Sequence, residues 1–276
     1  MFLSFDIIYQ LPAVRGIIIC NMNWETRRKF LYALATIITL AAVTVYLLRD
    51  VFFPLPTCFD KKQNGYEIGV DCGGTCSLRC SSEVAPLSVL WTRVIRTSST
   101  TYDIVGMVSN KNINSSARNA EYIFTVYNDK GQPVQDFPGV TLTPVSSDFP
   151  IVIQSVKSAQ ILSNATLTLK DGSHYTVHEK PVSPTLSIGN EKYEEGSIPR
   201  VYVTVQNKKR ITVTNLPIKV ILFDQDNNAY AVGQTIVPEL NKEESKVVSF
   251  TWDAPLPYPP TRIRAYTMFD PFLPVQ

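Results

Sequence analysis

NKNINSSARNAEYIFTVYNDKGQPV (residues 110–134) and NKKRITVTNLPIKVILFDQDNNAYAV (residues 207–232) decide the fold, because the second stretch repeats the pattern of the first. In each copy Asn-Lys is followed by a crossing loop, a long apolar strand that ends in an aromatic residue, and a turn that contains Gly or Asn. The copies start about 97 residues apart, which is an ordinary length for one domain. The sequence therefore predicts two successive copies of one domain.

Apolar and polar residues alternate through both copies and their surroundings. TYDIVGMVSN (residues 101–110) and RVYVTVQN (residues 200–207) are typical strands, and turn signals recur about every 8 to 12 residues. This pattern predicts two β-sandwich domains, at residues 85–180 and 183–276. We expect each to fold by itself, with Trp91 in the first core and Trp252 in the second.

An uncharged apolar run, FLYALATIITLAAVTVYLL, occupies residues 30–48. At about 1.5 Å per residue it is long enough to cross a hydrocarbon core of about 30 Å. A buried core helix would show a polar stripe, and a cleaved signal peptide would need small residues at its cleavage site, which LLRDVFFPLP does not offer. We expect a transmembrane signal-anchor helix that contacts the lipid bilayer through residues 30–48.

Basic residues flank the apolar run on its N-terminal side. Arg27, Arg28 and Lys29 stand before it, whereas Arg49 after it is offset by Asp50. Because basic flanks stay in the cytoplasm, this asymmetry predicts a cytoplasmic segment at residues 1–29 and an extracytoplasmic C-terminal part. The expected location is the cell membrane, with a single span.

The start of translation is left open between Met1 and Met22. Met22 opens NWETRRKF, and a signal-anchor usually begins close to its basic cluster. A start at Met22 would also remove Cys20 and leave four cysteines, all beyond the membrane.

Four cysteines define a small module at residues 56–82. The segment CFDKKQNGYEIGVDCGGTCSLRC contains almost no large apolar side chains and needs covalent links to hold a shape. We expect two disulfides, with three connectivities open, among Cys58, Cys72, Cys76 and Cys80. Zinc is the alternative, although zinc sites favour paired C-x₂₋₄-C knuckles in a reducing compartment.

Oxygen-bearing side chains are spaced through the same module. Asp60, Asn64, Glu67 and Asp71 are weak candidates for a calcium site, because Ca²⁺ prefers carboxylate and amide oxygens. The favoured interpretation is that these side chains cap turns. Asn64-Gly65 and Gly73-Gly74 should supply the positive φ angles of tight turns.

The module resembles a short cysteine module found in many exported proteins. The resemblance rests on the string C-x-D-x-x-x-N-G-x-E-x-G-V-D-C-G-G-x-C, which starts at Cys58. The sequence departs from that pattern at Lys61, where Gly is usual, and in the spacing from Cys76 to Cys80. The resemblance labels a family and implies no activity.

The repeated strands carry a second resemblance. Phe124, Tyr127 and Asp129 in FTVYND are similar to the F-x-L-Y-D signature of bacterial extracytoplasmic immunoglobulin-like domains, and VILFD keeps Leu222 and Asp224. The whole plan resembles uncharacterised bacterial single-pass envelope proteins. The implied fold class is mainly β, with two tandem immunoglobulin-like β-sandwiches preceded by one transmembrane helix and the disulfide module.

No residue pattern in the sequence indicates catalysis or a cofactor. The histidines His174 and His178 would lie about 13 Å apart on a strand, too far to share a metal unaided. Asp224, Asp226 and Asn227 could ligate a cation, but the same residue types suit a hairpin turn, which we favour. The net charge of +2 offers no field that would hold nucleic acid.

We therefore expect a non-enzymatic, membrane-anchored interaction module of the cell envelope. Its partner would be another envelope protein or a glycan, and its oligomeric state is left open. One alternative is a structural spacer or stalk that associates with its own copies, and a less favoured one is a metal-dependent enzyme. Exposed rings at Tyr193, Tyr230 and Tyr258 would favour binding over the spacer.

Overall fold

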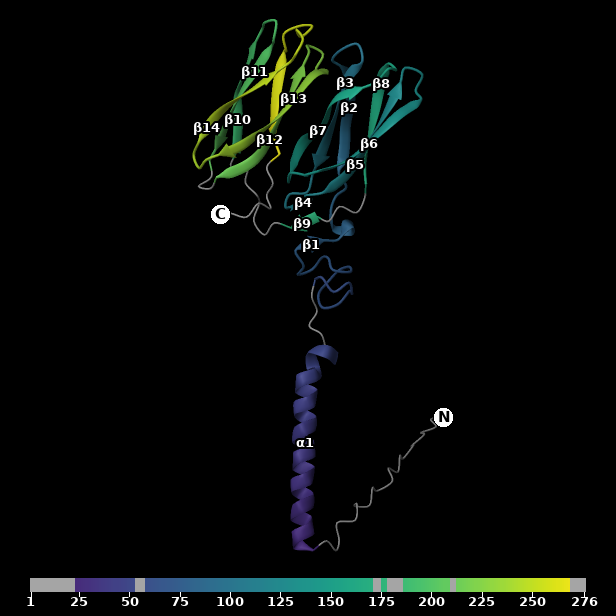
Figure 1. The fold of residues 1–276 in the computed structure, drawn as a ribbon, viewed down its shortest axis with the longest axis vertical. Coiled ribbons are helices and arrows are strands. Elements are labelled where there is room, and N and C mark those ends of the chain that lie inside the picture. Colours follow the sequence, from purple (N-terminus) through teal and green to yellow (C-terminus); the bar gives the residue numbers. More distant parts are fainter. Residues whose placement is uncertain (1–22, 53–57, 171–174, 178–185, 209–211, 269–276) are drawn as a thin grey trace, which may run out of the picture. The chain divides into compact units, whose positions relative to one another are not determined.

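The computed structural model describes residues 23–52, 58–170, 175–177, 186–208 and 212–268 (Figure 1). The chain divides into two compact units, residues 1–56 and residues 57–276. Several features discussed above lie outside the described residues. They are Met1, Met22 and Cys20, both histidines, and the predicted domain boundary between residues 180 and 183.

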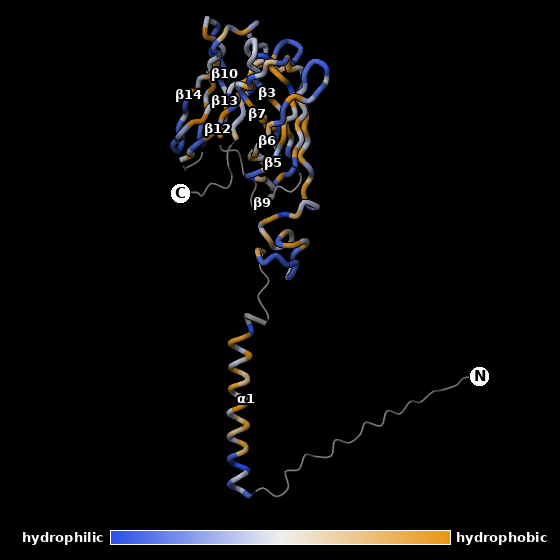
Figure 2. Tube along the Cα trace, turned by 45° about the vertical axis from the view of Figure 1, so that its right-hand side comes forward, coloured by the Kyte–Doolittle hydropathy of each residue, from blue (hydrophilic) through white to orange (hydrophobic). Residues whose placement is uncertain are grey.

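The first unit contributes helix α1, Trp24–Phe52. The apolar side chains of residues 24–49 are exposed, and Figure 2 shows hydrophobic colouring along most of the helix. Within the helix Thr36, Thr39 and Thr44 donate hydrogen bonds to carbonyls four residues earlier, at 2.7, 2.9 and 2.8 Å. These bonds satisfy hydroxyls that would be costly in hydrocarbon. By length and composition, residues 24–49 are able to cross a membrane.

The second unit is built from strands, which confirms the mainly-β prediction. The strands are β1 Leu78–Arg79, β2 Ser88–Arg96, β3 Thr101–Asn110, β4 Ser115–Ser116, β5 Ala120–Asn128, β6 Pro133–Thr141, β7 Ser147–Lys157, β8 Leu162–Leu169, β9 Tyr175–Val177, β10 Leu186–Glu194, β11 Arg200–Asn207, β12 Val213–Phe223, β13 Ala229–Leu240, β14 Ser245–Thr251 and β15 Arg262–Thr267. A 3₁₀ turn, η1, covers Ser81–Glu83.

Most of the strands form two pairs of three-stranded antiparallel sheets (Figure 1). The first sheet pair consists of β2-β3-β7 and β6-β5-β8, and the second sheet pair of β10-β11-β14 and β13-β12-β15. In each pair, six long strands follow one another along the chain. The first, second and fifth of them form one sheet, and the fourth, third and sixth form the other. This shared connectivity is what the sequence repeat predicts.

Each sheet pair encloses its own apolar core. The first core includes Phe124 from β5 and Phe149 from β7, so it is filled from both sheets. The second core likewise combines Val203 from β11 with Ile218 from β12. The apolar residues that alternate with polar ones in the sequence are thus the residues that point into the two cores.

A third apolar cluster, which we call the seam, joins the two sheet pairs. Ile95, Val105, Met107 and Val152 come from the first pair, and Ile221, Phe223, Ala229 and Val232 come from the second. Strands β3 and β12 are therefore buried on both faces. Along β12, Ile218, Val220 and Leu222 face the second core, whereas Ile221 and Phe223 face the seam.

The tryptophans differ in their placement. Trp252 packs against the second core, as predicted. Trp91 packs against the seam and not against the first core, with its ring edge-to-face on Phe223 at 6.3 Å between centroids, so that part of the prediction is wrong. The cause is a bulge in the pairing of β2 with β3 between Val89 and Trp91, which shifts the alternation of side chains.

A lysine is placed among the apolar residues of the seam face. Lys219 precedes Ile221 by two residues on β12, and its ammonium donates a hydrogen bond of 2.8 Å to the carbonyl of Pro150 on β7. Burial lowers the pKa of Lys219 to about 8. Because the charged form is disfavoured in the folded state, the folded chain releases this proton more readily than the unfolded chain does.

We expect Lys219→Met to remove a pH-dependent contribution to the free energy of unfolding. The pKa of Lys219 is depressed on folding, so the stability of the wild type should rise as the pH passes above about 8. Between pH 7 and pH 9 the wild type should gain about 1 kcal/mol of unfolding free energy relative to Lys219→Met. Urea denaturation of both full-length proteins at the two pH values measures this difference. Parallel pH profiles would contradict it.

Candidate functional site

The cysteine module contains two disulfides. Cys58 is bonded to Cys76, and Cys72 to Cys80. The two-disulfide prediction is confirmed, and the connectivity that the sequence left open is first to third and second to fourth. The sulfurs that would ligate zinc are thereby covalently paired. Glu67 Oε1 lies 3.4 Å from Cys76 Sγ, a sulfur that carries no proton to donate.

The carboxylates of the module accept hydrogen bonds from its backbone. Both oxygens of Asp71 accept from the Lys61 amide, at 3.1 and 2.9 Å, and one also accepts from the Asp60 amide. Glu67 accepts from the Asn64 amide at 3.1 Å, and Asp60 from the Asn64 side chain at 2.7 Å. This geometry suits turn capping, while calcium binding stays an untested prediction. Lys61 has a φ of 61°, the conformation that favours the Gly of the resembling pattern.

Gly74 is fixed by a close approach of the backbone. Its φ is +61°, and a Cβ at this position would lie 1.7 Å from the carbonyl oxygen of Tyr66. Gly131, in the turn between β5 and β6, also has a positive φ, +73°, but a Cβ there would meet nothing within 4 Å. A substitution at Gly131 therefore introduces backbone strain alone, whereas a substitution at Gly74 introduces the same strain together with a steric clash.

Gly74→Ala is expected to prevent the native closure of the module. In the wild type the four cysteines of the module should carry no free thiol, and the variant should show free thiols or altered pairing. The matched control Gly131→Ala should cost about 1 kcal/mol through its φ and leave both disulfides intact. Thiol labelling under denaturing conditions and disulfide mapping by mass spectrometry decide the point. Native pairing in Gly74→Ala would mean that the backbone approach is unimportant.

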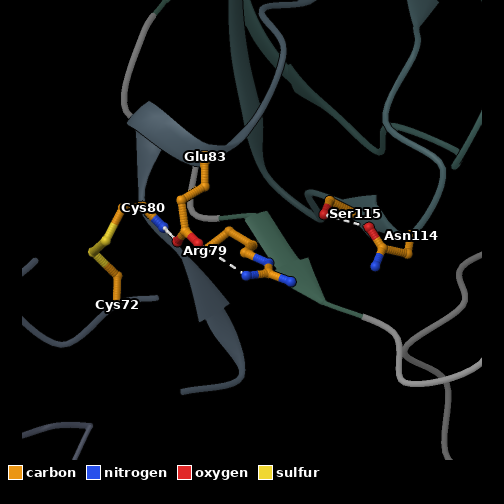
Figure 3. Close-up of polar contacts among 6 residues, drawn as sticks. All are labelled: Cys72, Arg79, Cys80, Glu83, Asn114 and Ser115. Carbon is orange, nitrogen blue, oxygen red and sulfur yellow. Dashed lines mark hydrogen bonds and ion pairs between the residues drawn. A yellow bond between two sulfur atoms is a disulfide. The ribbon is translucent and has the colours of Figure 1, made fainter. Parts of the chain in front are cut away.

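Glu83 links the module's last turn to its second disulfide (Figure 3). Its carboxylate pairs with the Arg79 guanidinium at 2.9 Å and accepts from the Cys80 amide at 3.1 Å. Strand β1 then pairs with β9, which also pairs with β4, the short strand between β3 and β5 in the chain. In the same view, Ser115 of β4 donates to the side-chain oxygen of Asn114 at 3.3 Å. Backbone pairing thus ties the module to the strands that follow it.

The basic flank predicted to set topology lies in the first turns of α1. Lys29 contacts Glu25 at 2.6 Å, with both side chains well exposed, and Arg28 lies over the Tyr32 ring at 6.0 Å. An exposed pair of this kind contributes little to stability. Arg27, Arg28 and Lys29 are all exposed, so their charges are accessible to solvent or to lipid headgroups.

A cleft of about 400 Å³, which we call the tyrosine cleft, lies between the two sheet pairs. The first pair supplies the β2–β3 turn and Gln154, and the second supplies Tyr230 and Trp252 with a Pro-containing stretch at residues 253–257. Tyr230 donates a hydrogen bond of 3.0 Å to the carbonyl of Tyr258, and the two rings lie 4.6 Å apart. Tyr230 and Trp252 are the aromatic residues of the lining on the side of the second pair, and Tyr258 packs on Tyr230 beside the cleft.

A shared carbonyl joins two of the residues that line this cleft. Val232 O accepts from Gln154 Nε2 at 3.3 Å and from Trp252 Nε1 at 3.1 Å, so it receives one bond from each sheet pair. Asp103 is buried and accepts from the Ser155 amide at 2.9 Å. The pKa of Asp103 is raised, because the effect of burial exceeds the opposing effect of the hydrogen bonds from Ser155 and Gln154. Sequence reasoning missed Asp103, although a charged residue within the apolar run YDIVGMV was a signal.

The three tyrosines chosen to separate binding from spacing differ in exposure. Tyr258 is 42% exposed, whereas Tyr193 and Tyr230 are partly buried against the second core. Burial raises the pKa of the Tyr230 phenol, and the nearby Tyr193, Tyr258 and Asp224 act in the same direction. The phenol of Tyr230 therefore stays a neutral hydrogen-bond donor at ordinary pH.

Asp224, at the end of β12, acts as a turn residue. Its carboxylate accepts from the amides of Asp226 and Asn228, at 2.9 and 2.8 Å, and Asn227 has a φ of 65°. Hydrogen bonds from Asn228 above all lower the pKa of Asp224. The geometry is that of the favoured hairpin interpretation.

These features together define a class of protein. It has an apolar helix able to cross a membrane, a two-disulfide module and a β-rich unit with a cleft between two sheet pairs. No protein-family model matches the chain, and no curated protein matches it.

Proposed function

We propose that this chain is a single-pass, membrane-anchored interaction module of the cell envelope, without enzymatic activity. Its N-terminus lies in the cytoplasm and residues 57–276 lie outside. Helix α1, its basic flank and two disulfides support this location, because disulfides persist in oxidising compartments. The lipid bilayer is contacted through residues 30–48.

The proposal includes an immunoglobulin-like fold for both sheet pairs. Their shared strand order supports it, as does the placement of the F-x-L-Y-D-like residues. Phe124 is fully buried in the first core, and Leu222 occupies the second. A duplicated sandwich is a common scaffold for presenting binding surfaces.

The tyrosine cleft is the observation that carries the binding proposal. Clefts between domains are common binding sites, and aromatic side chains supply contact area at a small cost in conformational entropy. Tyr258 offers an exposed ring beside a cleft whose polar groups come from both sheet pairs. A partner seated there would contact both copies of the repeat at once.

Site-specific photocrosslinking in intact cells tests this function. A benzophenone side chain at position 258 should crosslink another envelope protein or a glycan. The matched control is position 247 on β14, where Val247 is also exposed and lines none of the described clefts. Crosslinks at 258 only between copies of this chain would favour the spacer alternative, and equal products at both positions would reject a specific site.

A further inference from the structure

A second cleft between the sheet pairs is rich in arginine. This arginine groove has a volume of about 330 Å³. Arg93 of β2 contributes to one wall, and Arg262 and Arg264 of β15 contribute to the other. The aromatic residues Trp91 and Tyr266 also line the groove.

The arginines are held in place but are not neutralised. Arg93 Nε donates to the carbonyl of Ala229 at 3.3 Å, and the Arg262 guanidinium lies over the Phe223 ring at 4.4 Å. Arg262 Nε is buried without a hydrogen-bond partner. Within the described residues, no ion pair involves Arg93, Arg262 or Arg264.

Acidic groups near the groove do not balance its charge. Among the described residues that line the groove, Asp148 is the acidic one, and it is exposed. Asp224 lies close enough for its charge to interact with that of Arg93, but its oxygens already accept the hydrogen bonds of the turn. A group of guanidiniums with one carboxylate among them is short of acceptor oxygens.

Guanidinium groups bind oxyanions through paired hydrogen bonds. The groove is larger than a lone oxyanion requires, and Trp91 adds a flat apolar surface of the kind on which a sugar ring can rest. Resting on the proposed binding function, we propose that the arginine groove binds the carboxylate or phosphate groups of an anionic envelope glycan. Arg93 and Arg264 would contact the oxyanion, and Trp91 the adjoining ring.

Binding is measured with the full-length protein in nanodiscs of zwitterionic lipid. The probes are polygalacturonate for carboxylate and poly(ribitol phosphate) for phosphate, with neutral dextran and polyglutamate as comparisons. The test variant is Arg93→Gln combined with Arg264→Gln, both at exposed positions. The control is Arg200→Gln combined with Lys130→Gln, which removes the same charge from exposed sites outside both clefts.

One of the two anionic glycans should bind in a salt-sensitive way, and the groove variant should weaken it at least about tenfold while the control changes it little. Trp91→Phe should weaken the glycan more than it weakens inorganic phosphate. Binding to neither glycan, equal losses in both double variants, or equally tight binding of polyglutamate would overturn the proposal. Crosslinking at position 258 is an independent readout: its persistence alongside failed glycan binding rejects the groove alone, and its absence rejects the proposed function.

Discussion

Replacing Ile221 by aspartate is expected to open both sheet pairs together and to lower the free energy of unfolding by about 4 to 5 kcal/mol. Ile221 is 0% exposed and belongs to the seam, which also contains residues of β3 and β7. A carboxylate there is removed from water among apolar side chains, and pairing it with Arg264, directly opposite on β15, or with Lys219 would draw a second charge into the seam. Both sheet pairs lose packing in either case.

Hydrogen exchange read by mass spectrometry shows how far the damage spreads. In Ile221→Asp, amides of β5 in the first pair should exchange faster along with those of β11 in the second. The control Val247→Asp, at a position 63% exposed on β14, should change stability by less than about 0.5 kcal/mol. Faster exchange confined to the second pair would show that the repeats unfold separately, as the sequence alone suggested.

The sequence predicted the elements well because each depends on local pattern. Alternation in RVYVTVQN gave β11, the uncharged run at residues 30–48 gave α1, and Gly73-Gly74 gave a turn with positive φ. The duplication was readable because both copies keep the same order of strand, loop and turn. Each signal spans only a few neighbouring residues.

The seam was not predicted because it depends on how two domains meet. Its sequence signal is present: IVGM in β3 and VILF in β12 are unbroken apolar runs, which indicate strands buried on both faces. Both were interpreted as single-faced strands. Lys219 concealed the signal in β12, since a lysine ordinarily marks an exposed face. The cysteine pairing was likewise out of reach, because spacing alone permits three connectivities.

Reversing the basic flank should change the orientation of the whole protein. Arg27→Glu, Arg28→Glu and Lys29→Glu, together with lysines added after Leu48, would move the positive charge to the other end of the apolar helix. Because positive flanks are retained in the cytoplasm, most molecules should invert or adopt mixed topology. Disulfides should then fail to form in the module, since the cytoplasm keeps thiols reduced. Full retention of the wild-type disulfides would show that this charge cluster does not set topology.

Labelling of intact cells with a membrane-impermeant maleimide tests the central claim most directly. In a Cys20→Ser background, a single cysteine is placed either at Ser98, in the exposed turn between β2 and β3, or at Glu25, at the start of α1. The extracytoplasmic account predicts labelling at position 98 in intact cells and at position 25 only after the membrane is broken. Labelling at position 25 with protection at position 98 would contradict it.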